Sequence, residues 1–322
     1  MTATIPTIDL SAFLSGSDVE RKAIAKTVDR ICSSIGFLII QNHRVDLAII
    51  DRAWSMASAF FDFPLEKKLL VHPADPECPR GYFPPQSETL AKSRGIDTPP
   101  DRKETFSSGA LCAPDGVSGG EYFDFFYGRN IWPVEPVGFR DAWIAYYHSM
   151  ERLGSAVMQL FAAALDLPDD YFARFHTHHI SALRANHYPR VTDASLPDQN
   201  RAGPHSDYGS VTVLRPDPDV GGLEIKLPSG QWYAAPLIED TFIINIGDML
   251  ARWTNDRWVS TLHRVVDPEI GSQRRLSIAY FQVPNFDAVI RCIPTCLATG
   301  QIEKHAPINA GPYLMDRFRS TV

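Results

Sequence analysis

Short strand-like segments crowd the second half of the chain, and their density limits the folds that it can adopt. They are separated by turn-forming residues, for example Pro228, Ser229 and Gly230. The segments with strand character are residues 183–188, 210–214, 223–227, 231–234, 241–246, 261–266 and 276–283. Short strands at this density favour a sheet rolled onto itself, the jelly-roll or double-stranded β-helix.

Much of the rest of the chain shows the apolar periodicity of helices. Residues 18–34 carry an apolar stripe of Ile24, Val28 and Ile31, and Ser17 or Asp18 can cap the helix. Residues 48–63 and 139–165 predict two more helices, the last of them the longest. Residues 67–136 have little regular pattern and predict a loop-rich lid and wall. We therefore expect an α+β fold with four parts: an α-rich N-terminal region (1–135), a long support helix (136–180), the jelly-roll core (181–290) and a C-terminal segment with a helix (291–322).

Three residues of the strand-rich part have the chemistry of metal ligands. In a strand, residues i and i+2 point to the same face, so His205 and Asp207 can reach one ion together. His263 would join them from a distant strand. Two imidazoles and one carboxylate form the facial triad of non-haem Fe(II) oxygenases, although zinc accepts the same donors. An isolated His-x-Asp more often makes ordinary hydrogen bonds, so this prediction depends on the residues that accompany it.

The first accompanying feature is Arg275-x-Ser277. Strand alternation places Arg275, Ser277, Ala279 and Phe281 on one face. A guanidinium offers a planar fork to a carboxylate, and the serine hydroxyl adds another donor. Standing alone, this pattern would be an ordinary surface arginine on a strand.

The second feature lies upstream, where Arg184, Asn186 and Tyr188 alternate onto one face. Buried polar groups need partners. A bound acid would provide them.

Taken together, these motifs resemble the Fe(II)- and 2-oxoglutarate-dependent oxygenases, in particular the isopenicillin-N-synthase-like branch. The resemblance covers nearly the whole chain. The family's N-Y-Y-P segment appears here as Asn186-His187-Tyr188-Pro189, and further matching segments are residues 5–10, 36–43, 60–68, 80–83, 103–106, 221–223, 245–248 and 253–255. The departures are His187 in place of a tyrosine, Arg44 in place of a glycine, and a stretched, proline-rich segment at 214–223.

The resemblance implies that His205, Asp207 and His263 bind Fe(II), and that Arg275 and Ser277 bind 2-oxoglutarate with help from Asn186 and Tyr188. It implies O2 as a further substrate, with ascorbate as a candidate activator. Decarboxylation of 2-oxoglutarate to succinate would accompany hydroxylation, desaturation or ring closure of a small organic substrate. No catalytic residue is expected beyond the metal ligands.

Two residues are predicted to face the substrate, Phe281 and Arg184. Arg184 would favour an acidic or phenolic substrate, unless it forms an ion pair within the barrel.

The amino-acid composition of the chain limits the classes of partner that it can bind. The chain of 322 residues has 31 basic and 38 acidic residues, a net charge of −7, which argues against a dedicated nucleic-acid surface. No apolar run is long enough to span a bilayer, and no signal peptide is recognised. The five cysteines are scattered, as expected of free thiols in a reducing cytosol. We expect a cytoplasmic protein, monomeric or weakly dimeric, without nucleic-acid or membrane partners.

Three alternatives remain open at this point. One is an oxidase of the same fold that does not use 2-oxoglutarate and whose Arg-x-Ser pair binds the substrate's own carboxylate. Another is a non-catalytic small-molecule binder. The third is a zinc hydrolase.

Overall fold

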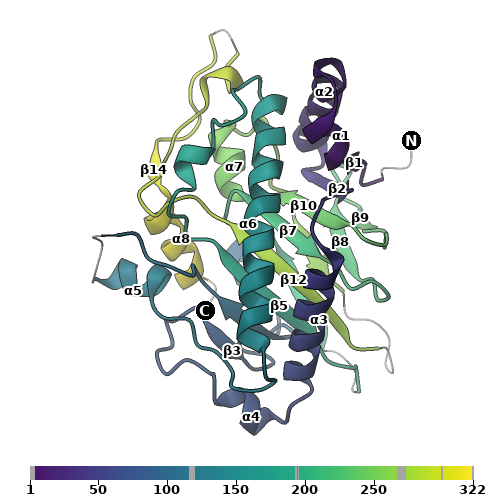
Figure 1. The fold of residues 1–322 in the computed structure, drawn as a ribbon, viewed down its shortest axis with the longest axis vertical. Coiled ribbons are helices and arrows are strands. Elements are labelled where there is room, and N and C mark those ends of the chain that lie inside the picture. The colour runs from purple at the N-terminus through teal and green to yellow at the C-terminus, as the bar shows by residue number, and fades with distance from the viewer. Residues whose placement is uncertain are drawn as a thin grey trace.

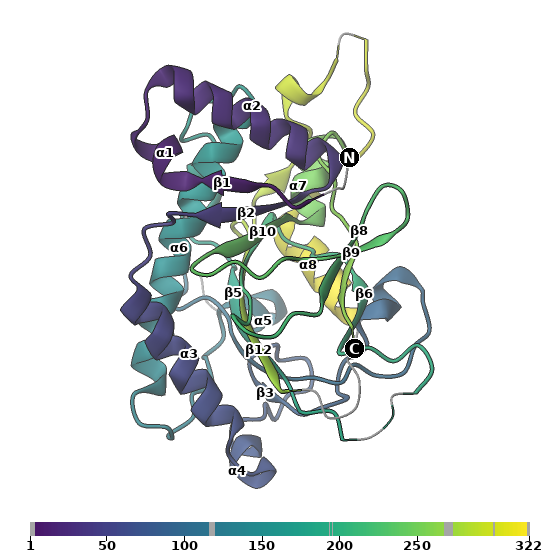
Figure 2. The same ribbon diagram turned by 90° about the vertical axis from the view of Figure 1, so that its right-hand side faces the viewer.

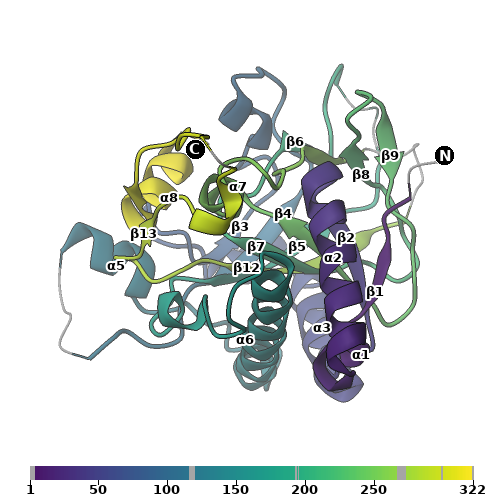
Figure 3. The same cartoon turned by 90° about the horizontal axis from the view of Figure 1, so that it is seen from above.

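Two facing β-sheets form the centre of the molecule, and helices cover the outer side of the larger one (Figures 1 and 3). The computed structural model describes residues 4–115, 120–192, 194, 196–266, 273–298 and 300–320. Within them the larger sheet has the order β1 (Thr7–Asp9), β2 (Phe37–Gln41), β10 (Phe242–Ile246), β7 (Val211–Arg215), β12 (Arg275–Gln282), β5 (Ala182–Tyr188), β4 (Glu104–Ser108), β3 (Gly81–Phe83). The smaller sheet has the order β6 (Ala202–His205), β11 (His263–Val265), β8 (Leu223–Lys226), β9 (Trp232–Ala234). This is the α+β, jelly-roll architecture that the short strands predicted.

The helical layer follows the predicted periodicity closely. Its members are α1 (Leu10–Ser15), α2 (Asp18–Ser34), α3 (Leu47–Phe61), α4 (Leu65–Leu69) and α6 (Phe139–Ala164). A capping box starts α2: Ser17 Oγ accepts from the backbone N–H of Glu20, and Glu20 Oε2 accepts from the backbone N–H of Ser17. The long helix α6 runs across the larger sheet (Figure 1), and its Trp143 Nε1 donates to Ser108 Oγ in β4 at 2.8 Å.

The region expected to be loop-rich, residues 67–136, contains two strands of the larger sheet, β3 and β4, and the helix α5 (Glu121–Tyr127). The strand β4 is buried throughout although its sequence is mostly polar. Its Glu104 accepts from Lys68 Nζ at 2.7 Å and from Tyr82 Oη at 2.5 Å, and lies 2.7 Å from His187 Nδ1. Because distant partners satisfy these buried groups, the strand lacks the alternation that marks half-buried strands.

The remaining elements close the ends of the sheets. They are α7 (Asp248–Trp253), α8 (Ala310–Arg319), the hairpin β13 (Val289–Ile290) with β14 (Ile308–Asn309), and the 3-10 helices η1 (Leu90–Arg94), η2 (Ala173–Phe175) and η3 (Pro294–Cys296). Residues 168–175 form only turns and η2. Among the described residues no helix is both long and apolar enough to cross a membrane.

Two apolar clusters result from this arrangement. The larger one fills the space between the helices and the larger sheet, and includes Trp143, Phe161 and Tyr280. The smaller one lies between the two sheets, and includes Phe37 of β2 and Ile225 of β8. The smaller sheet and α8 lie on the side of the molecule opposite α3 and α6 (Figure 2). A pocket opens beside the smaller cluster, in the space that the two sheets enclose. The four-part division of the chain expected from the sequence stays a prediction.

Candidate metal centre and the pocket beside it

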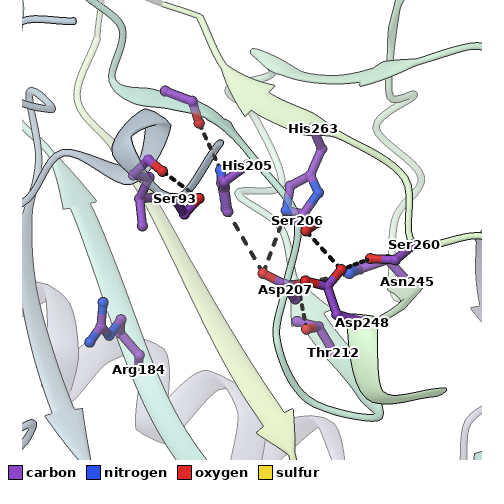
Figure 4. Close-up of polar contacts among 12 residues, drawn as sticks. Ser93, Arg184, His205, Ser206, Asp207, Thr212, Asn245, Asp248, Ser260 and His263 are labelled. Atoms are coloured by element: carbon purple, nitrogen blue, oxygen red, sulfur yellow. Dashed lines mark hydrogen bonds and ion pairs between the residues drawn. The ribbon is translucent and has the colours of Figure 1, made fainter. Parts of the chain in front are cut away.

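The three predicted donors come together at one point between the sheets (Figure 4). His205 is the last residue of β6, and His263 is the first residue of β11, directly opposite it in the antiparallel register. Asp207 lies two residues beyond the end of β6, so it reaches the site from a loop and not from the strand expected. Its Oδ1 lies 3.9 Å from His205 Nε2 and 3.7 Å from His263 Nε2. Separations of this size suit one ion bonded at roughly 2 Å to each N and O donor.

Hydrogen bonds to backbone carbonyls orient both imidazoles so that Nε2 is left for a metal. His205 Nδ1 lies 2.7 Å from the carbonyl oxygen of Gly203, and His263 Nδ1 lies 3.1 Å from that of Thr261. A carbonyl can only accept, so each Nδ1 carries the proton and each Nε2 keeps its lone pair for a metal. Burial, helped by the neighbouring His263, lowers the pKa of His205 to about 3. Both rings are thus oriented with Nε2 toward the position of a metal.

The carboxylate is oriented by two side chains of the larger sheet. Asp207 Oδ2 accepts from Thr212 Oγ1 at 2.5 Å and from Asn245 Nδ2 at 2.7 Å, which leaves Oδ1 directed at the two histidines. Burial alone raises the pKa of Asp207, but His263, His205 and these two hydrogen bonds lower it overall. The donor set is therefore one anion and two neutral imidazoles, a set that Fe(II) binds.

Behind these donors, Asp248 joins several segments. It accepts from Ser206 Oγ at 2.8 Å and from Ser260 Oγ at 2.6 Å (Figure 4). It also accepts from Arg317 Nη2 at 2.9 Å. Arg94 of η1 donates to the same Ser206 hydroxyl. Sequence patterns included Asn245 and Asp248 only within the matching segment 245–248, and Thr212 only within the strand-like segment 210–214.

Beside the metal donors, the pocket contains the buried guanidinium of Arg275. Only 2% of it is exposed, and its Nη1 donates to Ser277 Oγ at 3.2 Å. Its Nε is buried without a hydrogen-bond partner, and within the described part of the chain no acidic side chain forms an ion pair with it. Its guanidinium lies 5.0 Å from the centre of the Tyr188 ring. A buried guanidinium without a counter-charge is costly, so this one is suited to a bound anion.

The predicted pocket residues lie on consecutive rungs of the antiparallel pair β5–β12. Arg275 is opposite Tyr188, Ser277 opposite Asn186, Ala279 opposite Arg184 and Phe281 opposite Ala182. All eight line the pocket together with the metal donors. Neither the Tyr188 hydroxyl nor the Asn186 amide has a hydrogen-bond partner among the described residues. His187 points to the other face, toward Glu104.

Comparison with known proteins gives the family. Residues 179–284 match the 2OG-Fe(II) oxygenase superfamily, and residues 5–135 match the N-terminal family of non-haem dioxygenases in morphine synthesis. A validamycin A dioxygenase of Streptomyces hygroscopicus subsp. limoneus is 31% identical over 296 residues, which are 89% of this chain and 78% of that protein. The chain belongs to the 2OG-Fe(II) oxygenase superfamily.

Further relatives agree with this assignment. A 2-oxoglutarate-dependent dioxygenase of Penicillium crustosum is 33% identical over 88% of this oxygenase and 85% of its own length. The crystal structure of full-length Neurospora crassa T7H with alpha-KG and thymine superposes with a TM-score of 0.85 at 35% identity, covering 98% and 96% of the two chains. Like its relatives, this 2OG-Fe(II) oxygenase uses Fe(II), 2-oxoglutarate and O2 to oxidise a small substrate. The expected membership of the isopenicillin-N-synthase-like branch is confirmed.

Proposed function

We propose that His205, Asp207 and His263 hold the Fe(II), and that Arg275 and Ser277 bind the far carboxylate of 2-oxoglutarate. One observation carries the second part: the buried guanidinium of Arg275 has no anionic partner in the described chain, yet it opens onto the pocket that contains the three donors. When bound, the iron supplies the coordination sites and the redox chemistry that couple conversion of 2-oxoglutarate to succinate with oxidation of the substrate.

The protein's own residues bind the cosubstrate and orient the metal ligands. The Arg275 fork and the Ser277 hydroxyl converge on one carboxylate, while the Tyr188 hydroxyl and the Asn186 amide donate to the cosubstrate from the opposite strand. Thr212 and Asn245 hold the carboxylate of Asp207, as described above. No side chain is assigned a proton transfer, so placement determines which bond of the substrate reacts.

We place the substrate beside Arg184 and Phe281, farther along the paired strands β5 and β12 than the cosubstrate. The walls there are largely apolar: Phe125 and Phe126 come from α5, and Leu314 and Phe318 from α8. The Neurospora relative binds thymine. We take a compact, ring-bearing molecule as the substrate, with hydroxylation, desaturation or ring closure as the outcome. A cytoplasmic enzyme that is monomeric or weakly dimeric, without nucleic-acid or membrane partners, completes the proposal, and the net charge of −7 supports the absence of a nucleic-acid surface.

The alternatives differ in measurable ways. An oxidase that binds its substrate's carboxylate at Arg275 releases no succinate, a zinc hydrolase does not need oxygen, and a non-catalytic binder turns nothing over. The complete donor set speaks against the last of these, and the unpaired Asn186 and Tyr188 support binding of 2-oxoglutarate.

The decisive experiment is calorimetric titration of 2-oxoglutarate into the metal-loaded protein, together with succinate measurement under air. Arg275→Ala should weaken 2-oxoglutarate binding about 100-fold or more, because it leaves a buried carboxylate without its counter-charge. Arg264→Ala is the matched control, since Arg264 pairs with Glu224 and does not line the pocket. Unchanged 2-oxoglutarate affinity in Arg275→Ala would refute the assignment.

A further inference from the structure

The guanidinium of Arg184 lies at the substrate end of the pocket, and one of its nitrogens has no hydrogen-bond partner among the described residues. Its Nε donates to Ser107 Oγ at 2.8 Å, and its Nη1 donates to both oxygens of Glu88 at 2.9 and 3.2 Å. Its Nη2 has no hydrogen-bond partner among the described residues and is not fully enclosed, which leaves it available to a molecule in the pocket that Arg184 lines. Figure 4 shows this side chain apart from the metal donors, on its own strand. Arg184 is thus fixed on two sides and offers donors on the third.

The positive charge of Arg184 is already balanced from behind. Glu88 also lies 3.1 Å from Lys103 Nζ, and Asp101 lies 3.6 Å from the same nitrogen. Two cations and two anions therefore form one compact group, and only its cationic members line the pocket. This ion pair is the alternative that the sequence left open for Arg184. It removes the reason to expect a carboxylate there, because the charge that would attract one is already neutralised.

Arg80, a cation outside this ion-pair group, offers no substitute. Arg80 lines the pocket, but its Nη1 and Nη2 donate to the carbonyls of Phe125 and Asp124 at the end of α5. Its Nε is buried without a partner, out of reach of a molecule in the pocket. Arg80 fixes the helix that carries the aromatic wall.

We infer that the substrate is an uncharged, ring-bearing molecule whose carbonyl or similar acceptor meets Nη2 of Arg184, and that Glu88 excludes carboxylic acids from this place. The inference rests on the proposed function and names the substrate class of the same site. A neutral acceptor gains the Arg184 hydrogen bond without disturbing the ion pairs. A carboxylate must compete with Glu88 for the same guanidinium, and it gains little from a group whose charges already balance.

Matched pairs of ligands test this directly. The probes are benzamide with benzoate, cyclohexanecarboxamide with cyclohexanecarboxylate, and thymine as a ring imide. Binding to the full chain loaded with Zn(II) and 2-oxoglutarate is measured by ligand-observed NMR, which detects weak ligands and does not depend on turnover. We expect each amide that binds to do so about tenfold or more tightly than its acid.

Two variants locate the cause of this discrimination. Glu88→Gln keeps the size of the side chain and one acceptor oxygen but removes its charge, so the acid-to-amide ratio should move about tenfold or more toward the acid. Glu224→Gln is the matched control, because Glu224 pairs with Arg264 outside the pocket and the ratio should not change. The thermal midpoint of each variant confirms that it is folded.

Three results would overturn the inference: an acid that binds the wild type as tightly as its amide, an unchanged ratio in folded Glu88→Gln, or no binding by any neutral probe. Failure of the proposed function is a separate result, since it appears as loss of 2-oxoglutarate binding before any probe is added.

Discussion

Ser206 donates a hydrogen bond of 2.8 Å to Asp248, and this contact ties the loop between two metal donors to the rest of the site. Ser260, three residues before His263, donates to the same carboxylate, and so does Arg317 of α8. One half-buried acid thus connects both donor segments with the helix that provides Leu314 and Phe318 to the substrate wall.

Asp248→Asn is expected to weaken metal binding about tenfold, because it loosens the supports of two ligands at once. It should also speed amide exchange in α8, since the ion pair with Arg317 is lost. Mn(II) titration followed by electron paramagnetic resonance measures the first effect, and hydrogen exchange of residues 310–319 the second. Asp256→Asn serves as control, because Asp256 pairs with His305 and Lys304 at the surface. Wild-type values for both quantities would show that Asp248 does not hold the site together.

Asn245→Ala should lower metal affinity 10- to 100-fold, the usual effect of removing a group that orients a ligating carboxylate. The amide of Asn245 holds Asp207 Oδ2 at 2.7 Å, and without it the carboxylate can rotate. The same Mn(II) titration tests this prediction. Thr212→Ser, which retains a hydroxyl for Asp207, should remain close to the wild type; if it loses as much affinity as Asn245→Ala, packing and not orientation is the cause.

Ser277→Ala should raise the KM for 2-oxoglutarate about 10- to 100-fold while kcat at saturation changes little. A single hydrogen bond to a charged group contributes about 1.5–3 kcal/mol, and the remaining Arg275 fork still positions the cosubstrate. Steady-state succinate release, measured over a range of 2-oxoglutarate concentrations, separates the two constants. A fall in kcat with an unchanged KM would instead assign Ser277 a role after binding.

The ion pairs of Glu88 predict a dependence of stability on pH. Burial alone raises the pKa of Glu88, but Arg184 and Lys103 lower it to about 2. Because the pKa in the folded state lies below the ordinary value of 4.5, the contribution is complete above that pH and is lost as the pH falls toward 2.

We expect the difference in unfolding free energy between wild type and Glu88→Gln to shrink by about 1 kcal/mol from pH 6 to pH 3.5. Urea denaturation at the two pH values measures this difference in unfolding free energy. Both proteins contain Asp101 and Lys103, so the comparison isolates the effect of Glu88. A difference that does not change with pH would mean that Glu88 is not held in its ionised form by these cations.

Much of the fold was predictable because local pattern determines it. The apolar stripe and the Ser17 cap predicted α2 with its observed bounds, and the alternation around Arg184, Asn186 and Tyr188 predicted the inward face of β5. The strand β4 could not be found in this way, since its buried Glu104 depends on partners far away in the chain.

The site shows the same division between local and distant information. Spacing predicted that His205 and Asp207 converge, but the direct pairing of His263 with His205 depends on strand register, which no short motif contains. Glu88 had no local signal at all, because Arg184, the residue that gives it a role, lies 96 positions further along the chain.

The β5–β12 ladder fixes a length that inhibitor design can use. Arg275 and Ala279, the residue opposite Arg184, are four residues apart on one strand, roughly 14 Å at the usual rise. A single compound that joins a carboxylate to a neutral ring through a spacer of that reach would bridge both anchors. Such a bisubstrate inhibitor would discriminate between this oxygenase and others by the ring that it carries, since its acidic end would suit them all.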